Sequence, residues 1–127
     1  NSRKLGLKNR IKFFSKSFED FGSYKFDLIV SNPPYVKTSE INNLSDDVKR
    51  FEPKIALDGG KDGLDVIKKV IYKSNTILKK FGLLALEIGY GQYYKVSQIL
   101  KKKNFKEELL VKDYKNNVRC ILARLKY

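Results

Sequence analysis

The stretch Phe26 to Tyr35, FDLIVSNPPY, joins an apolar strand to a proline-stiffened corner. Residues Leu28 to Val30 are apolar and partly β-branched, which is typical of a strand covered on both faces. Pro33 and Pro34 have no N–H to donate to a sheet, so the strand must end by Asn32. In open α/β sheets, ligands bind outside the carboxyl ends of the strands. The sequence therefore predicts a ligand-binding loop that begins at Asn32.

The residues of this corner suit a planar –NH2 group. The side-chain oxygen of Asn32 accepts N–H donors, and proline carbonyls are free acceptors because proline has no N–H of its own. Tyr35 offers a flat aromatic face. Two acceptors would hold both N–H bonds of an amide or a base amine and direct the nitrogen lone pair at an electrophile. A proline turn with a capping asparagine is the simpler interpretation of an Asn-Pro pair, but NPPY directly after an apolar strand is more specific.

At these residues the chain resembles a known family. Asn32 to Tyr35 is similar to the signature of class I S-adenosylmethionine-dependent methyltransferases that act on amino groups in planar systems. Three further blocks are similar to the HemK/PrmC family of release factor glutamine methyltransferases, namely FEP at 51–53, ALDGGKDGLD at 56–65, and LEIG at 86–89 with Gln92. The resemblance runs along nearly the whole chain, and the 58–65 block distinguishes this family from nucleic-acid methyltransferases.

The resemblance implies a reaction and a substrate. It implies methyl transfer from S-adenosyl-L-methionine to the side-chain amide nitrogen of the glutamine in the Gly-Gly-Gln motif of peptide chain release factors. Asn32 and Pro33 are then the catalytic residues, because their oxygens accept the two amide N–H bonds. Pro34 and Tyr35 complete the substrate-binding corner as walls around the planar group.

For the cofactor, the resemblance implies contacts from Asn32 and from Ser17 and Phe18, which lie in the loop that cradles adenine in the family. The acidic residue expected in that loop is absent, and Lys16 stands at a matching position. The Gly-rich turn and the ribose-binding carboxylate of a dinucleotide-type fold are absent too. We therefore expect the chain alone to bind S-adenosyl-L-methionine weakly or not at all.

Hydrophobic periodicity predicts the remaining elements. Two amphipathic helices are expected over Asp62 to Phe81, with Gly82 as the stop, and over Gly91 to Lys103. A helix tail is expected over Asn1 to Leu7, and further strands over 11–14, 83–88, 105–111 and 118–125. This alternation predicts an α/β chain, a partial Rossmann-like class I methyltransferase fold with a mainly parallel sheet and an antiparallel last strand.

The long polar segment from Val36 to Gly63 has two interpretations. By its resemblance to the family it helps to form a substrate groove, whereas by composition alone it is equally an ordinary surface excursion. The whole chain, residues 1–127, is interpreted as the C-terminal portion of a methyltransferase catalytic domain, because the strands and the cofactor loop that should precede the Phe26–Ser31 strand are missing. Residue Asn1, in place of methionine, also favours a piece of a longer protein.

Composition limits the partners. The formal charge of +13 favours an RNA-rich partner or a nucleic-acid contact through the basic surface, although a lysine-rich proteome explains scattered lysines as well. A single cysteine, Cys120, fits a reducing compartment, and no apolar run is long enough to span a bilayer. We expect a cytoplasmic protein that is a monomer. No histidine is present for a triad or a metal site. A DNA or RNA amino-methyltransferase and a non-catalytic basic fragment are the alternative functions.

Overall fold

The computed structural model describes residues 1–127 and contains one four-stranded sheet. Strands β1 (Phe26–Ser31), β2 (Leu78–Glu87), β3 (Phe105–Lys112) and β4 (Val118–Leu125) lie in the order β1-β2-β4-β3. β1 is parallel to β2, and β4 is antiparallel to both β2 and β3. Only β4, the last strand in sequence, therefore runs against the others, which confirms the predicted mainly parallel sheet with an antiparallel last strand.

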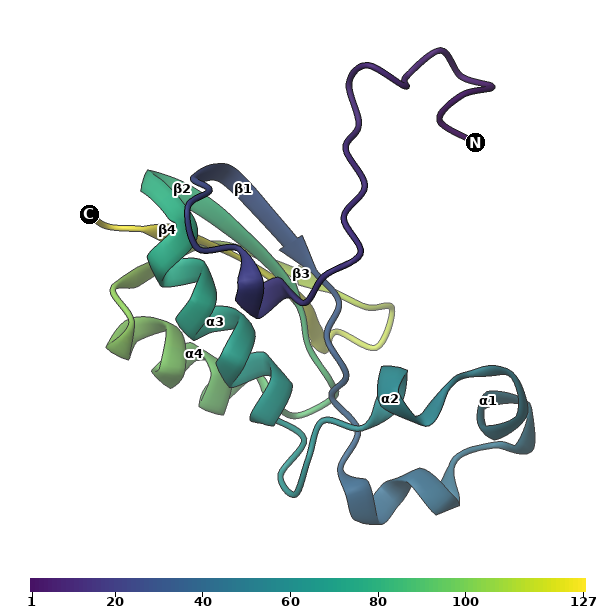
Figure 1. Ribbon diagram of the computed structural model, residues 1–127. Coiled ribbons are helices and arrows are strands. Elements are labelled where there is room, and N and C mark those ends of the chain that lie inside the picture. The colour runs from purple at the N-terminus through teal and green to yellow at the C-terminus, as the bar shows by residue number, and fades with distance from the viewer.

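Two helices, α3 (Asp65–Ile77) and α4 (Tyr93–Lys102), lie side by side against one face of the sheet (Figure 1). Each buries one apolar stripe, as helical periodicity predicts. The buried residues of α3 include Ile67 and Ile71, and those of α4 include Val96 and Leu100. No helix has the length and apolarity that crossing a membrane requires.

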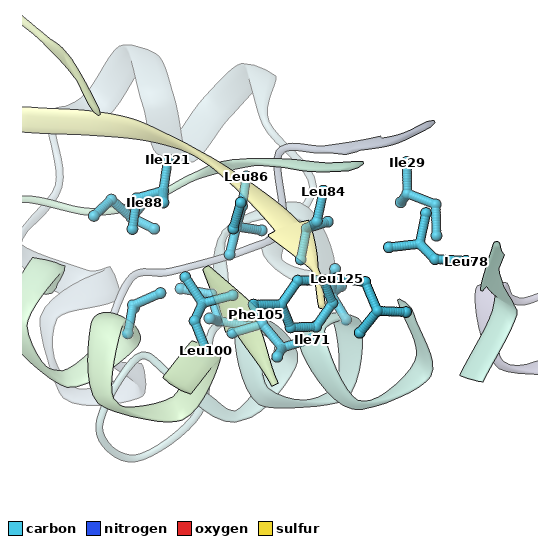
Figure 2. Close-up of a cluster of buried hydrophobic side chains, with 14 of the residues drawn as sticks. Ile29, Ile71, Leu78, Leu84, Leu86, Ile88, Leu100, Phe105, Ile121 and Leu125 are labelled. Carbon is cyan, nitrogen blue, oxygen red and sulfur yellow. The ribbon is translucent and has the colours of Figure 1, made fainter. Parts of the chain in front are cut away.

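The core lies between these helices and the sheet (Figure 2). Side chains of β2 and β4, such as Leu86 and Ile121, point toward Ile71 and Leu100 on the helices. Phe105, the first residue of β3, is fully buried among them. Because alternate residues of a strand face opposite sides, the second half of β2 and of β4 buries every second residue, whereas β1 and β3 each bury one, Ile29 and Phe105.

The 36–63 segment extends away from the sheet and contains only short helical turns (Figure 1). These are η2 (Thr38–Asn43), α1 (Asp46–Phe51) and α2 (Lys54–Leu57), and a further turn, η1 (Phe18–Asp20), precedes β1. Ile41 is the one fully buried side chain of these four elements. The segment thus has almost no core of its own.

The predicted helix over Asp62 to Phe81 is too long. α3 ends at Ile77, and Leu78 is already the first residue of β2. Leu78 lies opposite Phe26, but the next pair is Leu83 opposite Leu28, so residues 79–82 form an irregularity in the strand. Phe81 has a positive φ of 64° there. Pairing with β1 outweighs the apolar spacing that favoured a helix, and Gly82 is not a helix stop.

Two predictions for the amino-terminal segment are also wrong. Residues 1–7 form isolated turns and not a helix tail, and no strand forms over 11–14. A few residues cannot nucleate a helix without packing. A strand needs a neighbour, and the only partner of β1 is β2. The amino-terminal chain therefore leads away from the sheet as irregular structure (Figure 1).

The edge and the second face of the sheet are apolar and exposed. On β1, Ile29 faces the core and is 8% exposed, whereas Leu28 and Val30 on the other side are 50% and 73% exposed. The pairing register continues this face across β2, β4 and β3 through Leu83, Ala85, Leu122, Cys120, Leu109 and Val111. The last two are exposed, and the other four are half-buried. A free edge with an apolar face is a site for pairing with another polypeptide.

Neighbouring positions of β1 provide a test. We expect Val30→Lys to reduce self-association of the chain and to change the free energy of unfolding by no more than about 0.5 kcal/mol, because the side chain is in solvent. Ile29→Ala should cost about 2–5 kcal/mol because it removes core packing. Light scattering and urea unfolding followed by circular dichroism measure the two effects. Equal destabilisation by both variants would show that Val30 is packed.

Candidate active site

The NPPY corner directly follows the last residue of β1, Ser31, as predicted. Asn32 is exposed, Pro33 is buried, and Pro34 and Tyr35 are half-buried. The two prolines stop the strand because neither can donate a hydrogen bond to β2. A carboxamide is thus presented to solvent on a stiff, partly buried backbone.

All four residues of the corner line one cavity of about 400 Å³. The opposite walls come from the 36–63 segment and are mostly apolar, with Val36, Leu44, Val48, Glu52, Ala56 and Leu57. The segment is therefore more than a surface excursion, because it shapes a cleft directly beside the corner.

The corner is rich in hydrogen-bond acceptors. No hydrogen bond within the chain engages the carbonyl of Pro33 or the carboxamide of Asn32. The nitrogens of Pro33 and Pro34 carry no hydrogen, so no adjacent donor competes for these oxygens. This arrangement is suited to a ligand that brings two N–H donors, such as a primary amide or an exocyclic base amine.

Gln92, just before α4, ties the corner to two other loops. Its Nε2 donates to the carbonyl of Tyr35 at 3.0 Å and to that of Gly63 at 3.1 Å. Its Oε1 accepts from the N–H of Gly89 at 2.8 Å, where β2 has just ended. One carboxamide thus satisfies backbone groups from three chain segments, which holds the corner in place. The sequence pointed to Gln92 only through the family resemblance and not through its contacts.

Glycines allow the 59–63 loop to lie against the corner. A Cβ on Gly59 would lie 2.8 Å from the Cα of Tyr35 and 2.8 Å from the carbonyl oxygen of Gly63. Gly63 has a φ of +73°, and its Cβ would lie 2.5 Å from the carbonyl oxygen of Tyr35. No other residue type fits at these contacts. Gly59 and Gly63 of the DGGKDGLD block are therefore required by backbone packing.

The carboxylates of the same block stabilise the loop. Asp58 accepts from the Thr38 hydroxyl at 2.7 Å and from the Gly60 N–H at 3.0 Å, and these bonds, that from Thr38 above all, hold its pKa below the ordinary value. The Lys68 ammonium, 3.0 Å away, does the same for the pKa of Asp62. Both carboxylates therefore serve structure, and neither lies free as a base beside the corner.

Arg119 of β4 contacts Tyr35, and sequence reasoning did not find this contact. Its Nη2 donates to the phenol oxygen at 3.2 Å, and its guanidinium carbon lies 5.7 Å from the ring centroid. Arg119 also lies 4.0 Å from the carboxylate of Glu87 at the end of β2. The contact joins residues 84 positions apart, and no local pattern in the sequence marks either partner for the other.

The predicted cofactor residues are not brought together. The Ser17 hydroxyl accepts from the N–H of Glu19 at 3.3 Å and so caps η1, and Phe18 packs against the core. The cavity that Asn32 lines contains neither of them. Lys16, at one of the positions that match the family's adenine loop, lies with its ammonium 4.0 Å from the ring centroid of Phe21. The residues present therefore do not by themselves form a complete site for S-adenosyl-L-methionine.

Two glycines give a matched test of the packing around the corner. We expect Gly59→Ala to lower the free energy of unfolding by about 1–3 kcal/mol, because the new methyl group overlaps the backbone of Tyr35. Gly22→Ala has open space around its Cβ and no positive φ, so it should be neutral or stabilise by up to about 1 kcal/mol. Urea unfolding measures both variants. A harmless Gly59→Ala would contradict the close approach of the two loops.

Comparisons with known proteins relate this chain to methylases. A family model described as Eco57I restriction-modification methylase matches residues 1–120. The release factor glutamine methyltransferase of Clostridium botulinum is 49% identical over 100 residues, which are 79% of this chain and 35% of that protein. That of Clostridium acetobutylicum is 41% identical over 128 residues, 97% of this chain and 44% of that protein. The chain thus spans less than half the length of these curated relatives.

A solved structure shares the fold. The crystal structure of the ribosomal protein L11 methylase from Lactobacillus delbrueckii subsp. bulgaricus matches 99% of this chain and 51% of its own, with a TM-score of 0.61 and 17% sequence identity. These matches confirm the class I methyltransferase fold and the resemblance to release factor glutamine methyltransferases. Since the family model covers nearly the whole chain, this chain belongs to the family described as Eco57I restriction-modification methylase, and its curated relatives are release factor glutamine methyltransferases.

Proposed function

We propose that this chain carries the acceptor-binding part of an S-adenosyl-L-methionine-dependent methyltransferase. Its proposed substrate is the side-chain amide nitrogen of the glutamine in the Gly-Gly-Gln motif of peptide chain release factors. The observation that carries the proposal is the pair of free acceptors, Asn32 Oδ1 and the Pro33 carbonyl, in a cleft at the carboxyl end of β1. The names of the curated relatives support the choice of substrate.

The proposed role of the corner is to orient the amide. Asn32 Oδ1 and the Pro33 carbonyl accept its two N–H bonds, and Pro34 and Tyr35 wall the planar group. An amide nitrogen is a poor nucleophile because its lone pair is delocalised into the carbonyl, so its alignment with the methyl donor is decisive. Alignment of this kind can contribute about 7–11 kcal/mol to lowering a barrier. No strong base is required beside the nitrogen if the proton leaves after the methyl group has been transferred.

We also propose that residues 1–127 form the carboxyl-side portion of a catalytic domain. A preceding part of the polypeptide would pair with the free edge of β1 and supply the cofactor loop. The exposed Leu28 and Val30 support this, as do the shares of 35% and 44% of the relatives' lengths that the chain covers. The complete enzyme is proposed to act as a cytoplasmic monomer, in keeping with a single unpaired cysteine.

A nucleic-acid amino-methyltransferase is the second candidate. Two observations favour it, the family model's description as a restriction-modification methylase and the formal charge of +13. The same acceptor pair would hold the exocyclic amine of a base, and the basic surface would bind phosphates in a salt-dependent way.

A chimera tests the function. We would replace the matching segment of the Clostridium acetobutylicum relative by this chain and measure methyl transfer to a release factor, to DNA and to RNA. In this chimera, Asn32→Ala should lower kcat about 10²-fold and leave the Kd for S-adenosyl-L-methionine within about threefold, because misplacing the amide affects the reacting geometry. Asn43→Ala, an exposed asparagine of η2, is the matched control and should change neither.

Each contrary outcome has its own meaning. Equal losses of kcat and of cofactor affinity in Asn32→Ala would make Asn32 mainly a cofactor residue. Methylation of DNA or RNA but not of the release factor would favour the second candidate. Salt-dependent RNA binding without any methyl transfer would identify a non-catalytic basic module.

Cofactor binding by the chain alone is a separate test. We expect titration calorimetry to detect no binding of S-adenosyl-L-methionine at micromolar concentrations, because Ser17 and Phe18 do not line the cavity that Asn32 lines. The chimera, which has the upstream part of the relative, should bind it. Micromolar binding by the chain alone would contradict the proposed division of the domain.

A further inference from the structure

Tyr35 lies between two cavities and lines both of them. On one side lies the cavity of about 400 Å³ that Asn32 and Pro33 line. On the other lies a cavity of about 540 Å³, whose lining includes Gln92 and Arg119. Tyr35, Val36 and Leu44 line both cavities, whereas Arg119 lines only the second. Of the three shared residues, Tyr35 is the one to which Arg119 donates a hydrogen bond, so it is the direct link from Arg119 to a group held at Asn32.

Both ends of Tyr35 are held by residues from distant elements. Gln92 holds its backbone carbonyl, and Arg119 holds its phenol oxygen at 3.2 Å. Arg119 is itself well anchored, because its carbonyl accepts from the N–H of Ile88 at 2.9 Å and its guanidinium lies beside Glu87. The ring orientation thus depends on the junction of β2 and β4, outside the corner.

We infer that Arg119 is a positioning residue that fixes the Tyr35 ring beside the amide-binding corner. The inference rests on the proposed function and extends it to a residue that no motif in the sequence marks. With the ring fixed, the planar group held by Asn32 and Pro33 has one rigid side. Without the guanidinium, the ring can turn about its side-chain torsions, and the amide loses its alignment while the two acceptors remain.

The guanidinium is suited to this role in a way that an ammonium is not. It is planar, so one N–H can donate to the phenol while the group remains beside the ring face. A lysine is a point charge on a flexible chain and can make only one of these contacts well. Arg119→Lys should therefore restore only part of the effect of Arg119, whereas a pure charge requirement would let lysine restore all of it.

Kinetics of the chimera test the inference. Arg119→Met should lower kcat about 10–10²-fold and leave KM for the release factor within about threefold, because alignment and not binding is lost. The kcat of Arg119→Lys should lie between that of the unmutated chimera and that of Arg119→Met. In a Tyr35→Phe background, Arg119→Met should have a smaller effect, because its main partner is already gone. Arg124→Met is the matched control, since Arg124 lies at the other end of β4 and pairs with Glu108.

A structural measurement is independent of activity. In the chain labelled with ¹³C-tyrosine, the Tyr35 ring resonances should shift or broaden in Arg119→Met and Arg119→Lys and stay in place in Arg124→Met. Unchanged resonances in both Arg119 variants would overturn the inference, as would a rise in KM with unchanged kcat, which would make Arg119 a substrate-binding residue. If the unmutated chimera methylates no release factor, the proposed function fails, and the ring resonances still decide whether Arg119 fixes Tyr35.

Discussion

The packing of three backbone segments around the Gln92 side chain is the constraint on which the site depends. The NPPY corner, the glycine loop at 59–63 and the end of β2 approach so closely that Gly59 and Gly63 leave no room for a side chain. Close backbone approach usually leaves polar groups without partners, and an unpaired buried group costs about 1–3 kcal/mol. Gln92 removes that cost for Tyr35, Gly63 and Gly89 at once.

The chemistry of the corner follows from what the prolines lack. Two successive residues without an N–H end β1 and leave acceptors that nothing inside the chain uses. The same termination places Asn32 at the strand's carboxyl end, in solvent and beside a cleft walled by the 36–63 segment. The residues that end the strand are thus also the ones that leave free acceptors beside the cleft. The acidic block from Asp58 to Asp65 differs from the corner, because the carboxylates of Asp58 and Asp62 are already hydrogen-bonded within the chain. These carboxylates stabilise the loop.

Helices cover only one face of the sheet, and the candidate site lies at the end of its edge strand, β1. One face packs against α3 and α4, and the other carries exposed apolar residues from β1 to β3. β1 is the edge strand, so the strand that ends in the NPPY corner is also the one with an unused row of backbone groups. A polypeptide that paired with that edge would lie next to Asn32, because Asn32 directly follows the last residue of β1.

Local chemistry in the sequence determined β1, its stop at Asn32, α4, and the β3–β4 hairpin, because proline sterics and apolar periodicity act over a few residues. Tertiary structure decided the rest. Leu78 to Phe81 could extend a helix by spacing, but pairing with β1 makes them strand, and residues 11–14 stay irregular because no strand lies beside them. The contacts of Tyr35 with Gln92 and Arg119 span 57 and 84 residues. Contacts over such separations form only when the sheet brings the ends of β1, β2 and β4 together, so no local pattern encodes them.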